Sequence, residues 1–313
     1  MSRPFARRRI RVRVPATTSN LGPGFDVLGL ALRLYNEVEL DALPEPGALE
    51  MDISGEGADT LPRDGTNVVV RAVRAGVRGR RLAFGLRLKL TNRIPLARGL
   101  GSSAAARLGG LLAVRALLGG RRAAQDGSVL DAAVRLEGHP DNVVPALHGG
   151  LCVCARDGNR TEFLRLGDPK GLVAAVCIPD FELPTAKARA VLPKTVPLQD
   201  AVATSGRAAL LVCALQQGRY DLLRTAMQDV LHQPYRRRLV LGMDRVIAAA
   251  LRAGAWGAAL SGAGPSILAL APVSRRAAAV GGAMQRAFAG ARVKSRFLVL
   301  EIASRGAEVS VLA

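Results

Sequence analysis

Cysteine and histidine are scarce in this sequence of 313 residues, which argues against a structural metal site. There are four cysteines and three histidines, and only Cys152 and Cys154 lie close together. Their C-x-C spacing is not one that structural zinc sites use, and in an alternating apolar run it directs both side chains to one face of a strand. We therefore expect free thiols in a cytoplasmic protein.

Long hydrophobic runs are also missing. No stretch approaches the roughly eighteen consecutive apolar residues of a membrane-spanning helix. Residues 1–15, MSRPFARRRIRVRVP, are basic but contain no apolar block and no small-residue cleavage site, so they are not expected to be a secretory signal. The hydrophobic share of 49% and charged share of 22% are ordinary for a soluble globular protein. We predict no membrane partner.

Acidic residues are few compared with basic ones, which gives a formal net charge of +19. Such a charge would suit nucleic-acid binding through phosphate contacts. Against this, the arginines are scattered, aromatic residues make up only 4%, and no nucleic-acid-binding motif is present. Arginine has replaced lysine nearly throughout, so we favour a basic protein with no specific nucleic-acid partner.

The length is sufficient for two lobes around a large core. Extended patterns alternate with helical ones without a regular strand–helix–strand rhythm, so the sequence favours an α+β fold. We expect strands at 10–14, 34–40, 84–90, 151–155, 173–178, 255–260, 267–271 and 296–302. We expect helices at 102–118, ended by Gly119 and Gly120, and at 129–136, 200–216, 243–251 and 275–288, with a loop at 138–145.

Residues 94–106, IPLARGLGSSAAA, form the most informative segment. Gly99 and Gly101 allow a sharp backbone turn, and the predicted helix that follows would present free amides and the positive end of its dipole. This arrangement favours phosphate binding, with Ser102 and Ser103 adding hydroxyl contacts or reaching a magnesium ion. The alternative is a glycine-rich turn capped by serine. The segment is neither a Walker loop nor a dinucleotide fingerprint.

Together with two other segments, this loop resembles the motifs of the GHMP kinase family. Residues 15–26 read PATTSNLGPGFD and residues 261–266 read SGAGPS, in the family's order. The resemblance implies a two-lobed fold: an N-terminal lobe like the second domain of ribosomal protein S5, at 1–168, and a ferredoxin-like C-terminal lobe, at 169–313. It also implies ATP and Mg²⁺ as cofactors.

Within the family, residues 15–26, EGHPDNVVPA at 137–146, TAKARAVLP at 185–193 and HQPYR at 232–236 resemble the branch that phosphorylates L-homoserine in threonine biosynthesis. One departure is Thr17-Thr18-Ser19, where that branch usually reads Thr-Ser-Ala. The alternatives are a kinase for another small alcohol, such as mevalonate or shikimate, and a catalytically silent regulator with this fold. Whether the chain forms a homodimer is left open.

The resemblance assigns roles to individual residues. Asp26 would bind the substrate ammonium, while Arg189 and Arg236 would hold the carboxylate as a fork. The remaining substrate contacts would be Asn20, His139, Asp141, Thr185 and Gly262. The adenine would lie near Asn67 and Val68, and the phosphates along Pro95, Arg98, Gly99, Leu100, Gly101, Ser102 and Ser103.

The metal ligands and the catalytic base are less fully determined. Mg²⁺ would bind Ser103 and a carboxylate, for which Glu137 is preferred over Asp131. The family's catalytic aspartate position falls on Asn142 by one alignment and on Asp141 by another. We favour Asn142, with catalysis by positioning and charge stabilisation rather than by a strong base. Asp141 would then chiefly contact the substrate.

Overall fold

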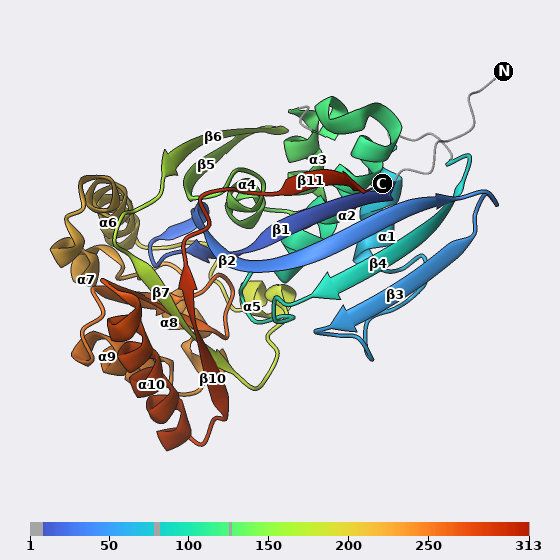
Figure 1. Cartoon of the computed structure of the whole chain (residues 1–313). Coiled ribbons are helices and arrows are strands. Elements are labelled where there is room, and N and C mark those ends of the chain that lie inside the picture. The colour runs from blue at the N-terminus through green and yellow to red at the C-terminus, as the bar shows by residue number, and fades with distance from the viewer. Residues whose placement is uncertain (1–8, 78–81, 125–126, 313) are drawn as a thin grey trace.

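The computed structural model describes residues 9–77, 82–124 and 127–312, and it confirms the α+β class. Two sheets are present in this part of the chain, one of seven strands and one of four. Figure 1 shows the larger sheet running through the molecule, with the smaller sheet and its helices packed against one end.

The larger sheet has the order β11-β1-β2-β4-β3, with the β5–β6 hairpin attached to β2. Among the strands that the structure describes, only β3 and β4 pair in parallel. Its strands are β1 (Arg9–Asn20), β2 (Gly24–Leu43), β3 (Leu49–Gly55), β4 (Gly85–Asn92), β5 (Leu151–Asp157), β6 (Arg160–Gly167) and β11 (Glu308–Leu312). The last of the described strands, β11, therefore pairs with the first, β1.

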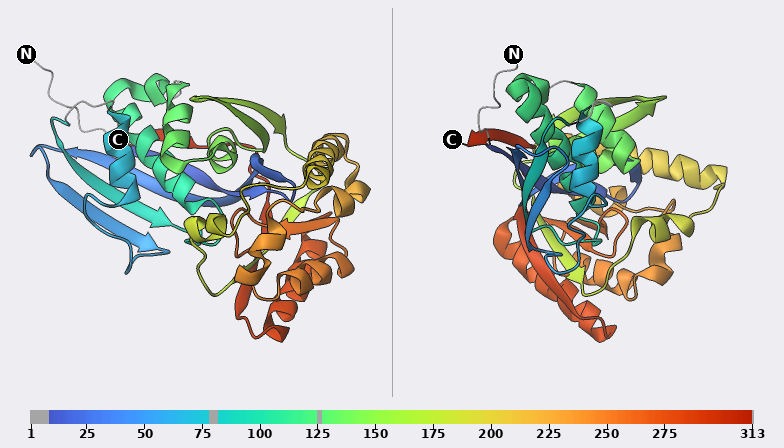
Figure 2. Two further views of the ribbon diagram at one scale, coloured as in Figure 1. Left: turned by 180° about the vertical axis from the view of Figure 1, so that it is seen from behind. Right: turned by 90° about the vertical axis from the view of Figure 1, so that its right-hand side faces the viewer.

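Helices cover one face of this sheet, as the view from behind shows (Figure 2). They are α1 (Val68–Gly76), α2 (Ser102–Ala124), α3 (Ser128–Glu137) and α4 (Pro140–His148). The alternation in β1 explains this one-sided cover. Ile10, Val12 and Val14 are fully buried, while the intervening arginines lie on the other face and pair across strands, Arg9 with Asp41 and Arg11 with Glu39.

The smaller sheet is antiparallel, in the order β10-β7-β9-β8, and α9 and α10 pack on it, as expected of a ferredoxin-like lobe. Its strands are β7 (Val173–Pro179), β8 (Gly257–Leu260), β9 (Ile267–Ala271) and β10 (Ser295–Glu301). The helices after β7 are α5 (Thr185–Ala190), α6 (Leu198–Gln217), α7 (Leu223–Ala226), α8 (Gln233–Arg236), α9 (Met243–Arg252) and α10 (Ser274–Gly290), with short 3₁₀ turns η1 (Tyr220–Leu222) and η2 (Arg237–Leu239).

The hydrophobic core is shared between the lobes. One cluster of buried side chains includes residues of both sheets, for example Leu30 in β2 and Leu268 in β9. A second cluster, with Phe288 and Val246, fills the space between the smaller sheet and its two helices. The division after residue 168 lies between β6 and β7, but β11 returns to the N-terminal sheet, so we retain that division only as a proposal.

One helix of the described residues, α6, is long and apolar enough to cross a membrane by length and composition alone. Its 18-residue window has a mean hydropathy of 1.2, and 22% of it is buried. The helix also contains Asp200 and Arg207. A single helix of this kind is weak support for a span, and the absence of a membrane partner stays a prediction.

One local expectation was wrong. The predicted loop at 138–145 is largely helix α4, because Pro140 stands at the first helical position, where its missing N–H is no loss, and His139 before it is extended. The predicted break at Gly119 and Gly120 is confirmed: the backbone of α2 is non-helical at Gly120, whose φ of 71° only glycine adopts readily, and a short second helical segment follows.

The four cysteines are free, as expected. Cys152 and Cys154 both lie on the buried side of β5. Burial raises the pKa of the Cys152 thiol to about 12, so it is a packed neutral group rather than a reactive one.

Helix α4 packs closely on β2 at Gly29, so a substitution there tests this contact. A Cβ at this position would lie 1.8 Å from the carbonyl oxygen of Asp141. We expect Gly29→Ala to lower the free energy of unfolding in urea by about 1 to 3 kcal/mol, because α4 must move. The matched control is Gly206→Ala in α6, where a Cβ would meet nothing within 4 Å and helix propensity predicts a gain of about 1 kcal/mol or less. Equal stabilities for the two variants would contradict this close approach.

Candidate active site

A cavity opens where the β1–β2 turn, the loop before α2, the start of α4 and the C-terminal lobe meet. Most residues predicted for the site line it: Asn20, Asp26, Pro95, Arg98, Gly99, Leu100, Gly101, Ser102, Ser103, Glu137, His139, Asp141, Asn142, Thr185, Arg189, Arg236 and Gly262. Asn67, Val68 and Asp131 do not. Asn67 is buried and caps α1, accepting from Val69 N at 2.9 Å, and its amide donates to the Pro62 carbonyl at 2.7 Å.

Three segments far apart in the sequence are joined beside the cavity. Ser261 is fully buried, and its hydroxyl donates to the Gly99 carbonyl at 2.7 Å and lies 2.8 Å from Thr18 Oγ1. Backbone bonds reinforce the junction: Gly262 N donates to the Ser19 carbonyl, and Thr17 N donates to the Leu100 carbonyl. The N-terminal motif, the glycine-rich loop and the C-terminal motif therefore form one unit.

The glycine-rich loop has the backbone that phosphate binding requires. Gly99 and Gly101 have φ angles of 74° and 68°, and a Cβ on Gly101 would lie 2.0 Å from Thr17 Oγ1. Ser102 starts α2 directly after the loop, so the free amides of the first helical turn face the cavity end. Arg98 adds a guanidinium whose buried Nη1 has no hydrogen-bond partner among the described residues. The loop and Arg98 suit a polyphosphate.

At the other end of the cavity, Arg189 forms a fork with Asp26. Its two terminal nitrogens lie 3.0 and 2.6 Å from the two carboxylate oxygens. Asp26 has a φ of 59°, and its N–H donates to Asn20 Oδ1, while the Asn20 amide donates to the Gly262 carbonyl. Both polar atoms of the Asn20 side chain therefore hold the β1–β2 turn in place. Such a left-handed non-glycine residue is held only where its surroundings compel it, often at functional sites.

Arg236 is buried, with 1% of its surface exposed, yet no carboxylate of the described residues forms an ion pair with it. It donates to the carbonyls of Ala188 and Gly262 and to His232 Nδ1. His232 Nε2 lies 2.8 Å from the Gly22 carbonyl, so it carries the hydrogen and Nδ1 accepts. Burial, followed by the repulsion of Arg189, lowers the pKa of Arg236 to about 10, which still leaves it charged at neutral pH.

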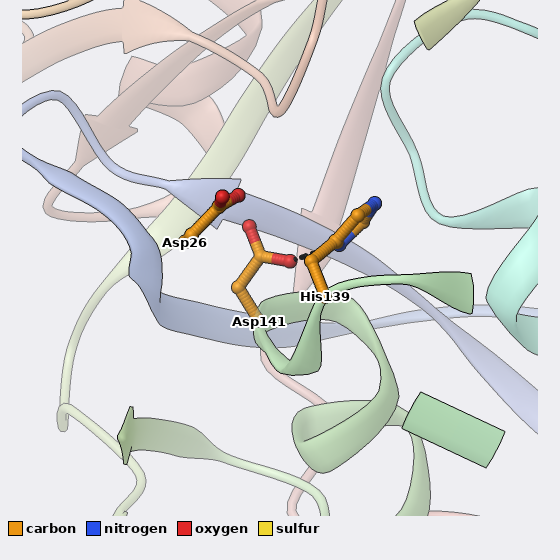
Figure 3. Close-up of side chains that lie close together, drawn as sticks. All are labelled: Asp26, His139 and Asp141. Carbon is orange, nitrogen blue, oxygen red and sulfur yellow. Dashed lines mark hydrogen bonds and ion pairs between the residues drawn. The ribbon is translucent and has the colours of Figure 1, made fainter. Parts of the chain in front are cut away.

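The carboxylates of Asp26 and Asp141 lie on facing elements, with His139 beside Asp141 (Figure 3). One donor atom from each residue falls within 4.8 Å of the others. His139 Nδ1 is 2.5 Å from Asp141 Oδ1. Burial alone would lower the pKa of His139, but Asp141, Glu137 and Asp26 together raise it above its ordinary value. The group is suited to a cation, either an ammonium or a metal ion.

Asn142 lies in the wall between the two ends of the cavity. Its Oδ1 accepts from Thr17 Oγ1 at 2.7 Å, and its amide donates to Ser19 Oγ at 3.0 Å. The hydroxyls of Thr17 and Ser19, which include the departure seen in the sequence, therefore fix the orientation of Asn142. A carboxamide held in this way can position a substrate but cannot accept its proton.

The residues predicted to bind magnesium meet at the start of α2. Ser103 Oγ donates to Glu137 Oε2 at 3.0 Å, and Arg107 Nη1 contacts both of these oxygens. A hydroxyl and a carboxylate oxygen this close are suitable ligands for Mg²⁺. Asp131 lies elsewhere and accepts from the backbone N–H of Thr161 in β6. Of the two acids, Glu137 is therefore the one beside Ser103.

Sequence reasoning missed several residues of the site. The Phe25 ring lies 5.4 Å from the guanidinium carbon of Arg189 and 5.3 Å from that of Arg236. It immediately precedes Asp26 in a motif already singled out, so the signal was available. His232 likewise opens the HQPYR segment already quoted and contacts Arg236 four residues further on. Arg107 had no comparable signal, since its partner Glu137 lies 30 residues away in the sequence.

Known proteins that are similar to this chain are consistent with this site. Models of the GHMP kinases N-terminal and C-terminal domains match residues 67–150 and 211–290. A homoserine kinase of Moorella thermoacetica is 46% identical, over 95% of this chain and 99% of that protein.

Solved structures agree. The crystal structure of homoserine kinase from Cytophaga hutchinsonii superposes with a TM-score of 0.85 at 34% identity, over 99% of this chain and 100% of that one. An L. major mevalonate kinase in complex with R-mevalonate has a TM-score of 0.72 at 18% identity, over 98% and 100% of the two chains, and so shares the fold alone. Because the similarity to such relatives extends over nearly the full length of this chain, the chain belongs to the GHMP kinase family.

Proposed function

We propose that this chain transfers the γ-phosphoryl group of ATP to the side-chain hydroxyl of L-homoserine, giving O-phospho-L-homoserine and ADP. The observation that carries the proposal is Arg236, a buried guanidinium without a carboxylate partner among the described residues, beside the Asp26–Arg189 pair. The buried arginine needs an anion, and the acidic group of Asp26 and Asp141 needs a cation. An amino acid supplies both. The relatives named homoserine kinase support the same substrate.

The substrate would be bound by its two charged ends. Its carboxylate would provide the counter-charge that Arg236 lacks and would share Arg189. Its ammonium would lie between Asp26 and Asp141, and Thr185 and the Gly262 backbone would line the same end. With both charges fixed, the hydroxyl is left facing the glycine-rich loop. Positioning of this kind supplies most of the rate acceleration in phosphoryl transfer.

The nucleotide would lie along the loop, with its phosphates on the backbone amides of residues 99–103 and on Arg98, and its adenine near Asn67 and Val68. We propose Ser103 and Glu137 as the protein ligands of Mg²⁺, which when bound would neutralise charge on the transferring phosphoryl group. In the reaction, the substrate oxygen forms a bond to the γ-phosphorus, the bond to ADP breaks, and the hydroxyl proton is lost.

No strong base is required in this scheme. Asn142, oriented by Thr17 and Ser19, would position the hydroxyl, and Asp141 would bind the ammonium together with His139. The proton would pass to a phosphate oxygen or to water as the loose transition state develops.

A role in threonine biosynthesis and a cytoplasmic location follow from the proposed activity and remain predictions. So do the lack of a specific nucleic-acid partner and the choice between monomer and homodimer, which sedimentation equilibrium would settle.

The substrate assignment is tested by ADP release with homoserine, mevalonate, shikimate, galactose and no acceptor, each with ATP and Mg²⁺. We expect the highest kcat/KM with homoserine, because it alone in this panel offers both charged ends. Faster turnover of another alcohol would reject the substrate but retain a kinase. No turnover with any acceptor, in a protein that still binds ATP, would favour a silent regulator.

Arg236→Met should raise KM for homoserine tens-fold or more, since truncating one side of a buried charge pair costs about 2 to 5 kcal/mol. KM for ATP should change by no more than a few-fold. The matched control is Arg237→Met, which removes a neighbouring but exposed guanidinium paired with Asp244. Equal losses of ATP and homoserine affinity in Arg236→Met would mean that this arginine maintains the fold instead of binding substrate.

Asp141→Asn separates substrate binding from proton abstraction. We expect a higher KM for homoserine and a kcat–pH profile of unchanged shape, because this carboxylate binds the ammonium and is not the base. If Asp141 were the base, kcat would fall by about 10² to 10⁴ with homoserine affinity retained, and an acidic limb of the wild-type profile would disappear in the variant.

A further inference from the structure

Arg107 lies one helical turn after Ser103 on α2 and is held to the oxygens that we assign to the metal. Its Nη1 contacts Ser103 Oγ and Glu137 Oε2 at once. Helical side chains lean toward the N-terminus of their helix, which brings this guanidinium back to the first turn of α2. The carboxylate has 9% of its side-chain surface exposed and the arginine 24%, so the contact is poorly screened by solvent.

This contact uses the groups that a metal ion would need. Ser103 Oγ donates to Glu137 and accepts from Arg107, while Glu137 Oε2 accepts from both. The other oxygen of Glu137 lies 4.0 Å from His139 Nε2. A divalent cation that binds Ser103 Oγ and Glu137 Oε2 must take these oxygens from Arg107 and must also overcome its positive charge.

We propose that Arg107 is an internal competitor of the divalent metal: it holds Glu137 in the nucleotide-free enzyme and yields it when the metal arrives with ATP. The polyphosphate makes this exchange possible, because its negative charge attracts the metal and stabilises the released guanidinium nearby. Arg107 is then a positioning residue that makes metal binding depend on nucleotide. The inference rests on the proposed function, since it takes ATP and a divalent cation as ligands.

The test is binding of Mn²⁺ to the nucleotide-free protein, measured by electron paramagnetic resonance. Arg107→Met keeps an unbranched apolar stem and removes the charged guanidinium. We expect it to bind Mn²⁺ at least about tenfold more tightly than wild type, the size of a charged hydrogen bond that no longer competes. Arg107→Lys, which can still pair with Glu137, should stay within a few-fold of wild type.

Two further variants control the measurement. Arg135→Met removes an exposed positive charge from the helix that carries Glu137 and should leave Mn²⁺ affinity unchanged. Glu137→Gln should abolish the tight binding in the Arg107→Met background. Binding that survives Glu137→Gln would assign the ion to Asp26, His139 and Asp141 and would overturn the proposal.

Equal Mn²⁺ affinities of wild type and Arg107→Met, with thermal melting showing both proteins folded, would also overturn it. If Arg107→Met does not fold, Arg107→Gln retains a neutral hydrogen bond to the buried carboxylate and provides the same comparison.

The free Mg²⁺ concentration for half-maximal ADP release should fall in step with the gain in Mn²⁺ affinity. If the wild-type protein does not turn over homoserine, the proposed function is wrong. The comparison of Mn²⁺ affinities in the nucleotide-free proteins would still test the role of Arg107.

Discussion

A single buried hydroxyl, that of Ser261, connects the glycine-rich loop to the first strand of the chain, and the site depends on that connection. Because the Gly99 carbonyl and Thr18 share this hydroxyl, the loop cannot shift without moving both lobes. The neighbouring backbone bonds of Thr17 and Gly262 leave little freedom for rearrangement. Precise positioning is what phosphoryl transfer needs most, and here it comes from polar contacts between distant segments, set on a shared apolar core.

The charges of the cavity are arranged before any ligand enters. Arg236 is held by carbonyls and by a neutral histidine, none of which cancels its charge. Burial is the largest factor lowering the pKa of His232, with Arg236 adding to it and Asp229 opposing it. Asp26, by contrast, is matched by Arg189. Asp141 lies beside it, so the pocket contains an unpaired guanidinium next to two clustered carboxylates, and this combination favours a ligand that has both signs of charge over one that is simply an anion.

Much of this was predictable from the sequence, and the failures have physical causes. The alternation at Ile10, Val12 and Val14 and the Gly99–Gly101 loop are local signals, and both gave the observed structure. Helix α4 was predicted as a loop, although Pro140 stands at a helix start, where its missing N–H is no loss. The contact of Arg107 with Glu137 joins two helices, so no spacing along the chain reveals it. The adenine site at Asn67 and Val68 rests on resemblance alone and stays a prediction; the Asn67 side chain itself caps α1.

The pairing of the final strand with the first one has a consequence for how the protein is made. Since β11 pairs with the outer edge of β1, the N-terminal lobe lacks this edge strand until residues 308–312 have left the ribosome. During synthesis β1 would expose unpaired backbone groups on that side, with the rest of the sheet already able to form. The N-terminal lobe therefore cannot complete its sheet before the C-terminal lobe has been synthesised, and the nascent chain carries an open sheet edge until β11 emerges.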